Sequence, residues 1–393
     1  MIRFTAPTRA PTALALALAL FGAAGLAQAA AFKAVVLLPA DDPRLERSRV
    51  ERAYLGHPTG AVTDGLAAAL KESRLELESA GASLMLESVP VAGAAEARAA
   101  AQKAEKAGVV ALFTDLPADA TLAVADAVKL PVLNLSAASD RLRQQDCRPR
   151  LYHVTPSERM RADALAQTLV SRKWMQVLLL TGPTPADAER AAVVQAALKR
   201  YGLKVTASKP FKLSGDPRER DLANPLLLTQ GGHDVVWVVD ADGEFARTLP
   251  YRTATPRPVV GDAGLVAVAW HAQFERYGAP QVSRRFAREA KRPISAPDWT
   301  AWLAGKALAA AVVAAPKGPA AAVHKALAEG EVDGSQGVPM SFRPWDGQLR
   351  QPLLLTDGQG VIGSAPVEGI LHPRNNLDTV GADAPEKLCK VVR

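Results

Sequence analysis

Short apolar runs alternate with longer stretches of helical periodicity in the first third of the chain. Runs typical of buried strands lie at 33–38, 84–89, 109–113 and 131–135. Between them, stretches with helix-forming composition lie at 64–80, 94–107 and 118–128. Gly81 and Gly108 follow two of these stretches, at the position where glycine commonly ends a helix. Strands and helices that alternate at this spacing predict βαβ units and a parallel sheet.

The same alternation begins again after residue 150. Further strands are predicted at 151–154, 176–180, 204–206, 234–239 and 258–260, and helices at 156–172, 186–201, 216–229 and 243–249. Two Ala-rich helices are then expected at 297–315 and 320–328. From Ser341 onward the pattern becomes β-like, and Asp-Gly pairs at 346–347 and 357–358 are typical of tight turns between strands.

This order predicts an α/β fold of two doubly wound parallel-sheet lobes joined by a multi-stranded hinge. A length of 393 residues favours two cores, because a single hydrophobic core stops growing well before this size. The expected division places residues 32–150 and 272–338 in lobe 1 and residues 151–271 and 339–365 in lobe 2. Residues 366–393 are expected to form a C-terminal tail.

The first 31 residues have the pattern of a cleavable signal peptide. Arg3 and Arg9 precede an apolar run at 13–26, which is too short to cross a bilayer comfortably. Small residues in an A-x-A pattern follow at 27–29 or 29–31, as signal cleavage requires. We therefore expect export to the periplasm and a soluble mature protein.

Charge and motif content argue against two functional classes. The formal net charge is +7, but Lys and Arg alternate with Asp and Glu along the whole chain, so a nucleic-acid partner is not expected. The chain has no GxSxG elbow, HExxH, strand-linked GxGxxG or phosphate-binding loop, and its six histidines show no metal-ligand spacing. We expect no catalytic or metal-ligating residues, no required cofactor and no enzymatic activity.

The chain contains two cysteines, Cys147 and Cys389, which lie 242 residues apart. In an oxidising compartment a pair of thiols tends to bridge, which would attach the C-terminal tail to the middle of the chain. The alternative is that both remain unpaired, small apolar residues.

Candidate ligand-binding residues follow the predicted strands. In doubly wound lobes ligands bind beyond the carboxyl ends of the strands, and with two lobes this places the site in the cleft between them. Arginine pairs with carboxylates and tryptophan stacks on flat rings. We expect carboxylate pairing by Arg141, Arg252 and Arg343, stacking by Trp270 and Trp345, and hydrogen bonding by Asn134, Ser136 and His271. The alternative is that the tryptophans pack in the hinge and the arginines are surface charges.

The chain resembles type I periplasmic binding proteins of branched-chain amino acid ABC uptake systems. The resemblance rests on residues 60–65 (GAVTDG), 130–137 (LPVLNLSA), 151–157 (LYHVTPS) and 174–180 (WMQVLLL). It implies a solute-binding protein that works with an ABC transporter permease. In such amino-acid binders the loop after the fourth strand offers hydroxyl groups to the ligand. Ser136 keeps this pattern, but Ala137 and Ala138 depart from it, which disfavours recognition of a zwitterion.

A narrower resemblance is to a subgroup of these binding proteins associated with pyrroloquinoline quinone (PQQ)-dependent alcohol dehydrogenase systems. It is carried by residues 240–245 (DADGEF), 249–253 (LPYRT), 269–271 (AWH), 341–352 (SFRPWDGQLRQP) and 368–378 (EGILHPRNNLD). The resemblance implies a role beside a periplasmic quinoprotein system, with PQQ, a flat tricarboxylate, as a candidate ligand. Alternatives are binding of an amino acid or an alcohol-derived metabolite, or an interaction or sensor module on the same fold.

Overall fold

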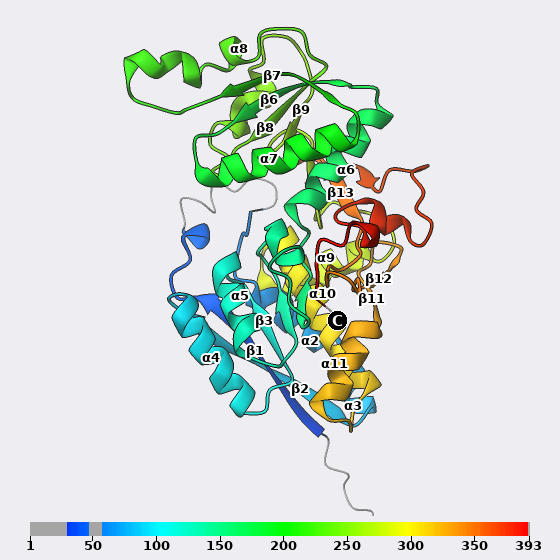
Figure 1. The fold of residues 1–393 in the computed structure, drawn as a ribbon. Coiled ribbons are helices and arrows are strands. Elements are labelled where there is room, and N and C mark those ends of the chain that lie inside the picture. The colour runs from blue at the N-terminus through cyan, green and yellow to red at the C-terminus, as the bar shows by residue number, and fades with distance from the viewer. Residues whose placement is uncertain (1–29, 47–56, 392–393) are drawn as a thin grey trace, which may run out of the picture.

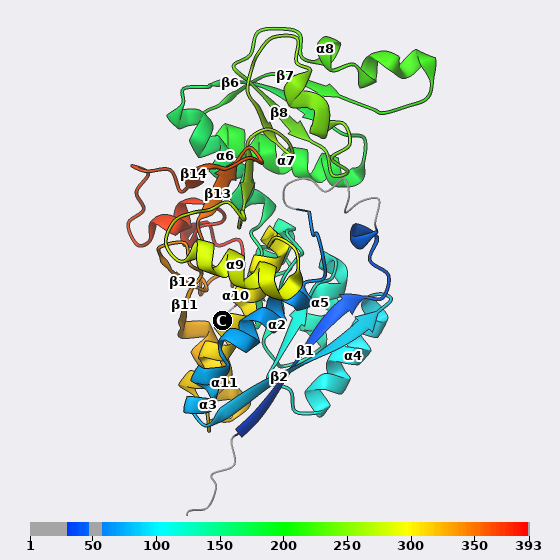
Figure 2. The same ribbon diagram turned by 180° about the vertical axis from the view of Figure 1, so that it is seen from behind.

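The computed structural model describes residues 30–46 and 57–391, which form two α/β lobes with connecting segments between them (Figures 1 and 2). The predicted signal peptide lies outside the described residues, except that Ala30 and Ala31 begin the first strand. Lobe 1 contains a five-stranded parallel sheet in the order β2-β1-β3-β4-β5. Its strands are β1 (Ala30–Pro39), β2 (Ala82–Val91), β3 (Ala111–Thr114), β4 (Val132–Asn134) and β5 (Leu151–His153).

Helices cover both faces of the lobe 1 sheet. They are α2 (Thr63–Glu72), α3 (Arg74–Ser79), α4 (Ala94–Lys106), α5 (Ala118–Ala127), α9 (Ala279–Ala290), α10 (Ala296–Ala314) and α11 (Ala320–Glu329). In β1, Val36 packs in the core that contains α2 and α10, whereas Val35 and Leu37 pack in the core that contains α4 and α5. Burial on both faces explains why β1 has a continuous apolar run rather than an alternating pattern.

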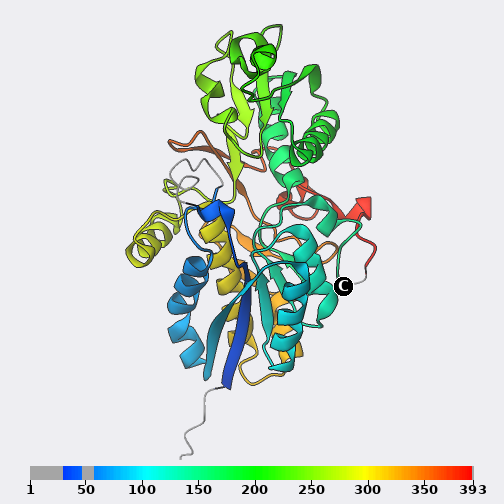
Figure 3. The same ribbon diagram turned by 90° about the vertical axis from the view of Figure 1, so that its left-hand side faces the viewer.

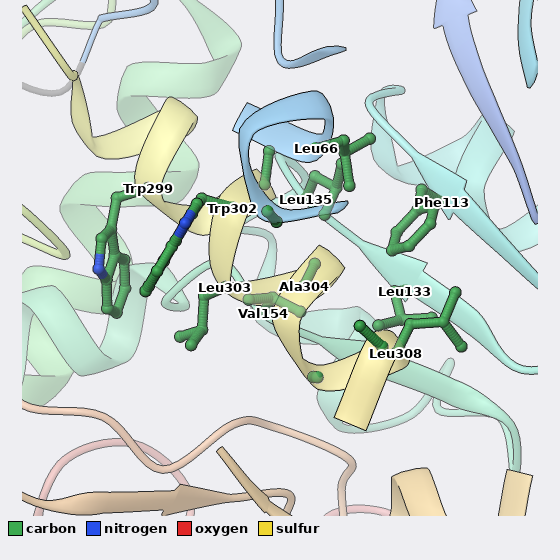
Figure 4. Packing of buried hydrophobic residues seen from close by; sticks show 14 of the residues in the cluster. Leu66, Phe113, Leu133, Leu135, Val154, Trp299, Trp302, Leu303, Ala304 and Leu308 are labelled. Carbon is green, nitrogen blue, oxygen red and sulfur yellow. The ribbon is translucent and has the colours of Figure 1, made fainter. Parts of the chain in front are cut away.

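Helices α2 and α10 form the centre of the larger core of lobe 1. Figure 4 shows Leu66 of α2 with Trp302 and Leu303 of α10. The two helices come close at Gly65, where an added Cβ would lie 2.3 Å from the carbonyl oxygen of Asp298. Glycine at this position therefore permits the close contact between α2 and the N-terminal end of α10.

Lobe 2 contains a four-stranded parallel sheet in the order β7-β6-β8-β9. Its strands are β6 (Gln176–Thr181), β7 (Lys204–Pro210), β8 (Val235–Val239) and β9 (Val259–Gly261), and its helices are α6 (Glu158–Ser171), α7 (Pro185–Arg200) and α8 (Pro225–Leu228). The helix predicted at 216–229 is instead a 3₁₀ segment at Pro217–Ala223 followed by the single turn α8. Proline at 225 cannot continue the preceding helix, because it lacks the N–H and clashes with the previous turn.

Antiparallel strands join the two lobes, as Figure 3 shows from the side. The sheet between the lobes has the order β10-β13-β14, with β10 (Val266–Val268), β13 (Leu353–Thr356) and β14 (Val361–Ala365), whereas β11 (Glu331–Asp333) pairs with β12 (Pro339–Ser341) beside α10 of lobe 1. The predicted α/β fold with two parallel-sheet lobes is thus confirmed. The boundaries differ in places: β5 pairs with β4 in lobe 1, although residues 151–153 were assigned to lobe 2, and Trp270 and Met340, also assigned to lobe 2, pack in the core of lobe 1. A three-residue strand carries too little pattern to assign to a sheet.

The C-terminal tail lies against lobe 1 and α6 and is held at several points. The predicted disulfide between Cys147 and Cys389 is confirmed and fixes the tail to lobe 1. The guanidinium group of Arg159 donates to both carboxylate oxygens of Glu386, and the N–H of Gly381 donates to Asp163 on α6. Within residues 30–46 and 57–391 there is no helix with the length and hydrophobicity of a membrane span and no side-chain cluster suited to a metal.

Candidate functional site

A cavity of about 300 Å³ lies between the two lobes, and we call it the interlobe cavity. Lobe 1 contributes the segments after β1 and β4 and the first turn of α10. Lobe 2 contributes the ends of β8 and β9 and one face each of α6 and α7, and β10 completes the wall. The cavity is therefore at the carboxyl ends of the parallel strands, where the topology places ligands in this class of fold.

Four charged side chains form the lobe 2 wall of the cavity. Glu158 and Arg161 belong to the first turns of α6, Arg190 to α7, and Asp262 follows β9. Arg190 pairs with Asp262 and, through Nε at 3.4 Å, with Glu158. Arg161 Nη1 lies 3.5 Å from the other oxygen of Glu158. The result is a chain of alternating charges across the wall, with Arg190 at its centre.

The ion pairs among these four side chains shift the pKa values of Glu158, Asp262 and Arg190. Burial alone would raise the pKa of Glu158, but the positive charges of Arg190 and Arg161 outweigh burial and hold the pKa below its ordinary value. Burial raises the pKa of Asp262, and Arg190 offsets only part of this effect. The pKa of Arg190 is raised because its two carboxylate partners outweigh burial. Glu158 and Arg190 are therefore both charged at neutral pH and neutralise each other.

Arg161 is the least engaged of the cavity arginines. The side chain of Arg161 is 36% exposed, and its ion pair within the described residues is the 3.5 Å contact with Glu158. Its buried Nε has no hydrogen-bond partner among these residues. By contrast, Arg44 on the lobe 1 side is held by Asp42 and by both oxygens of Asp115 at 3.0 and 2.8 Å. Arg161 thus retains donors that can face a bound anion.

Trp237 on β8 lines the cavity and packs in the core of lobe 2. It is 2% exposed, and its indole N–H makes no hydrogen bond within the described part of the chain. Gly261 on β9 lies beside it at a φ of +110°, and an added Cβ would lie 3.0 Å from the indole nitrogen and 2.2 Å from the carbonyl oxygen of Val238. Glycine at 261 therefore makes room for the indole at the strand end.

The lobe 1 wall combines apolar residues with three hydroxyl side chains, and Arg44 is its charged residue among those described. Ser136, Thr155 and Thr300 line it, and the hydroxyl groups of Thr155 and Thr300 make no hydrogen bond within the described residues. Ser136 follows β4, and its backbone N–H donates to Asn134 Oδ1 at 3.3 Å. These hydroxyl groups can each donate to a ligand oxygen, opposite the charged wall of lobe 2.

The structure places only one of the eight predicted ligand-binding residues, Ser136, in the wall of the interlobe cavity. Asn134 lies next to it but is fully buried, where its side chain accepts from the N–H of Ala137 and donates to the carbonyl of Ala137. Its role is to shape the loop that carries Ser136. Trp270 and His271 directly follow the cavity residue Ala269 without lining the cavity themselves.

Trp270 packs in the core of lobe 1 rather than against a ligand. Its ring stacks on Trp299 of α10 with centroids 5.5 Å apart, and 2% of the residue is exposed. Arg141 pairs with Asp119 and Asp146 on lobe 1, and Arg252 is exposed at the end of a 3₁₀ turn. These positions agree with the alternative interpretation, in which the tryptophan packs inside the protein and the arginines are surface charges, rather than with ligand contacts.

Arg343 and Trp345 also lie away from the cavity, which corrects their predicted role as cleft residues. Arg343 pairs with Asp378 at 2.8 Å and donates to the carbonyl oxygens of Leu377 and Val380, and Trp345 Nε1 donates to Ala382. Both side chains therefore hold the C-terminal tail. Arg343 was predicted to pair with a carboxylate of the ligand, but the carboxylate that it contacts, Asp378, belongs to this chain.

Arg161, Arg190 and Trp237 were not among the sequence candidates. They lie in helices and a strand, whereas most of the residues predicted from the sequence lie in the segments that follow the strands. A signal was nevertheless present, because Arg161 lies near the start of α6, where the helix dipole disfavours a positive charge. Trp237 is a single large aromatic residue within an otherwise β-branched strand. The position of Arg161 departs from what the local structure alone favours, as functional positions often do.

Two parallel-sheet lobes with a cavity at their facing strand ends define the type I periplasmic binding protein fold, and this chain has that fold. Residues 88–250 match the family model described as periplasmic binding protein. The match runs from β2 through most of lobe 2. No curated protein matches the chain at a significant level.

Solved structures of binding proteins share the fold at low sequence identity. A solute-binding protein of an ABC transporter from R. palustris in complex with benzoate is 15% identical, with a TM-score of 0.62 over 85% of this chain and 96% of that one. A branched-chain amino acid ABC transporter protein from Burkholderia xenovorans is 14% identical, with a TM-score of 0.67 over 85% and 95%. An ABC transporter substrate-binding protein from Desulfitobacterium hafniense in complex with Leu is 16% identical, with a TM-score of 0.64 over 84% and 98%.

Proposed function

We propose that this chain is a periplasmic solute-binding protein of an ABC-type system and that it binds a small acidic aromatic ligand in the interlobe cavity. The observation that carries the proposal is that Arg161, whose Nε has no partner within the described residues, and Trp237, an aromatic residue, both line the cavity. An acid with a ring would use both. Hinge closure would bring the hydroxyl groups of lobe 1 against the same ligand, which the permease would then accept.

The same-fold protein with benzoate supports an acidic aromatic ligand, and the one with Leu supports an amino acid. Within the class of acidic aromatic ligands, PQQ is the first to test, because the chain resembles binding proteins associated with PQQ-dependent alcohol oxidation. In that case the partner would be a periplasmic quinoprotein system or its transporter, and PQQ would be a cargo rather than a resident cofactor.

Titration calorimetry of the purified mature chain with PQQ is expected to show saturable binding to one site at micromolar concentration or below. Leucine and an alcohol-derived acid serve as comparison ligands. The PQQ assignment is wrong if no heat is released while thermal unfolding remains cooperative. Tighter binding of leucine under the same conditions would favour an amino-acid carrier instead.

Replacing Trp237 with leucine is expected to weaken binding of an aromatic acid about two- to tenfold, because a ring contact contributes about 0.5–1.5 kcal/mol beyond the buried area. Trp237→Phe, which keeps a flat ring, is expected to retain most of the affinity. Trp345→Leu is the matched control, because Trp345 contacts the tail rather than the cavity. Equal affinities of parent and Trp237→Leu protein would exclude ring recognition at this wall.

A further inference from the structure

We infer that the ligand is an acid without a free ammonium group, and that Arg161 supplies the positive charge that pairs with its carboxylate. This inference rests on the proposed function, since it concerns the ligand of the interlobe cavity. It names Arg161 as the residue that determines which charge type the cavity accepts.

A ligand with an ammonium group would need an acidic side chain in the cavity wall that is not already paired. Among the described residues, the cavity wall contains two carboxylates, Glu158 and Asp262. Glu158 pairs with Arg190 and Arg161, and Asp262 pairs with Arg190 and accepts the N–H of Asp240 at 2.7 Å. Each carboxylate is therefore already neutralised by arginine. An ammonium brought into this wall would lose its water without gaining an uncommitted counter-ion, which is strongly unfavourable.

A ligand carboxylate would need a positively charged side chain in the wall with donors available to it. Arg44, Arg161 and Arg190 line the cavity. Arg44 is held by two aspartates behind the wall, and Arg190 lies between two carboxylates. Arg161 shares Glu158 with Arg190 and has a buried Nε without a partner. Among the described residues, Arg161 is therefore the cavity arginine with the weakest ion pairing, and its guanidinium is the one most available to a ligand carboxylate.

The second oxygen of a ligand carboxylate would need a hydrogen-bond donor on the opposite wall. Thr155 and Thr300 bring free hydroxyl groups to the opposite wall, and neither carries charge. A carboxylate can thus be received by a cation from lobe 2 and by neutral donors from lobe 1. The same neutral hydroxyl groups could not replace the counter-ion that an ammonium requires.

Matched pairs of ligands test the charge rule directly. 3-Phenylpropanoate and L-phenylalanine share a ring and a carboxylate and differ by one ammonium, as do 4-methylpentanoate and L-leucine. We expect each acid to bind at least about tenfold more tightly than its amino acid, because an unpaired buried charge costs several kcal/mol. Equal or tighter binding of the amino acids would overturn the inference and leave the proposed binding function intact. If PQQ and all four probes fail to bind, the proposed function fails with it.

Arg161→Gln tests the residue assignment. We expect it to weaken binding of 3-phenylpropanoate roughly 10- to 100-fold, the range of a hydrogen bond to a charged group, and to abolish the preference for this acid over 3-phenylpropanamide. Glu158 keeps Arg190 as its partner, so folding is expected to be preserved, and Arg161→Lys is expected to restore part of the affinity.

The control variant is Arg98→Gln, which removes the same charge from the exposed face of α4, away from the cavity. It is expected to bind the acid and the amide as the parent does. Parent-like preference for the acid in Arg161→Gln would overturn the assignment of the counter-charge to this residue.

Discussion

Replacing Arg343 with glutamine is expected to reduce the free energy of unfolding by about 3–5 kcal/mol, the usual cost of removing one partner of a buried ion pair. The side chain of Arg343 is fully buried, and so is that of its partner Asp378. Its Nη2 also donates to the carbonyl oxygens of Leu377 and Val380 at 2.8 Å each. Glutamine cannot reach all of these acceptors, so buried oxygens would be left without donors.

Because Arg350 also pairs with Asp378, at 2.9 Å, the loss should fall in the lower part of that range. Urea unfolding of the parent and the variant measures it. Arg252→Gln is the control, since the side chain of this exposed arginine makes no hydrogen bond or ion pair within the described residues and its loss should change stability by less than about 0.5 kcal/mol. Ligand affinity is expected to be unchanged in both variants. Lost affinity with parent-like stability in Arg343→Gln would place Arg343 in ligand binding instead.

The fold was predictable because burial leaves a pattern that is local in sequence. In β8, every residue from Val235 to Val239 is buried, three packing in one core of lobe 2 and two in the other. A continuous run of this kind indicates a parallel strand covered on both faces, whatever the remote sequence. The same logic fails for β5, whose three residues are too few to indicate a sheet.

The site was less predictable because ligand contacts depend on residues that are distant in sequence. Arg343 and Trp345 have the side chains that an acidic ring would require, but the acid they serve is Asp378, brought in by the C-terminal tail. Conversely, the position of Arg161 near the start of α6 is unusual, but its available donors become evident only when Glu158 and Asp262 are seen to pair with Arg190. Nothing in the local pattern of charges tells which arginine keeps free donors once the lobes have folded.

The double variant Cys147→Ser, Cys389→Ser is expected to lose about 4–5 kcal/mol of stability, although each serine is close in size to the cysteine that it replaces. The cross-link joins residues 242 positions apart and so restricts most of the unfolded chain. In the chain-entropy account this restriction, rather than a contact in the folded protein, is the source of the stabilisation.

The folded structure and the ligand affinity of the double variant are expected to match those of the parent. The tail remains attached through the paired contacts of Arg159 with Glu386 and through the N–H of Gly381 bonded to Asp163, so the folded double variant should keep its structure. Neither cysteine lines the interlobe cavity, and ligand affinity should therefore equal that of the parent. Reducing agent should lower the urea midpoint of the parent to that of the double variant and leave the variant unaffected. A reduced parent as stable as the oxidised one would show that the tail is held by its non-covalent contacts alone.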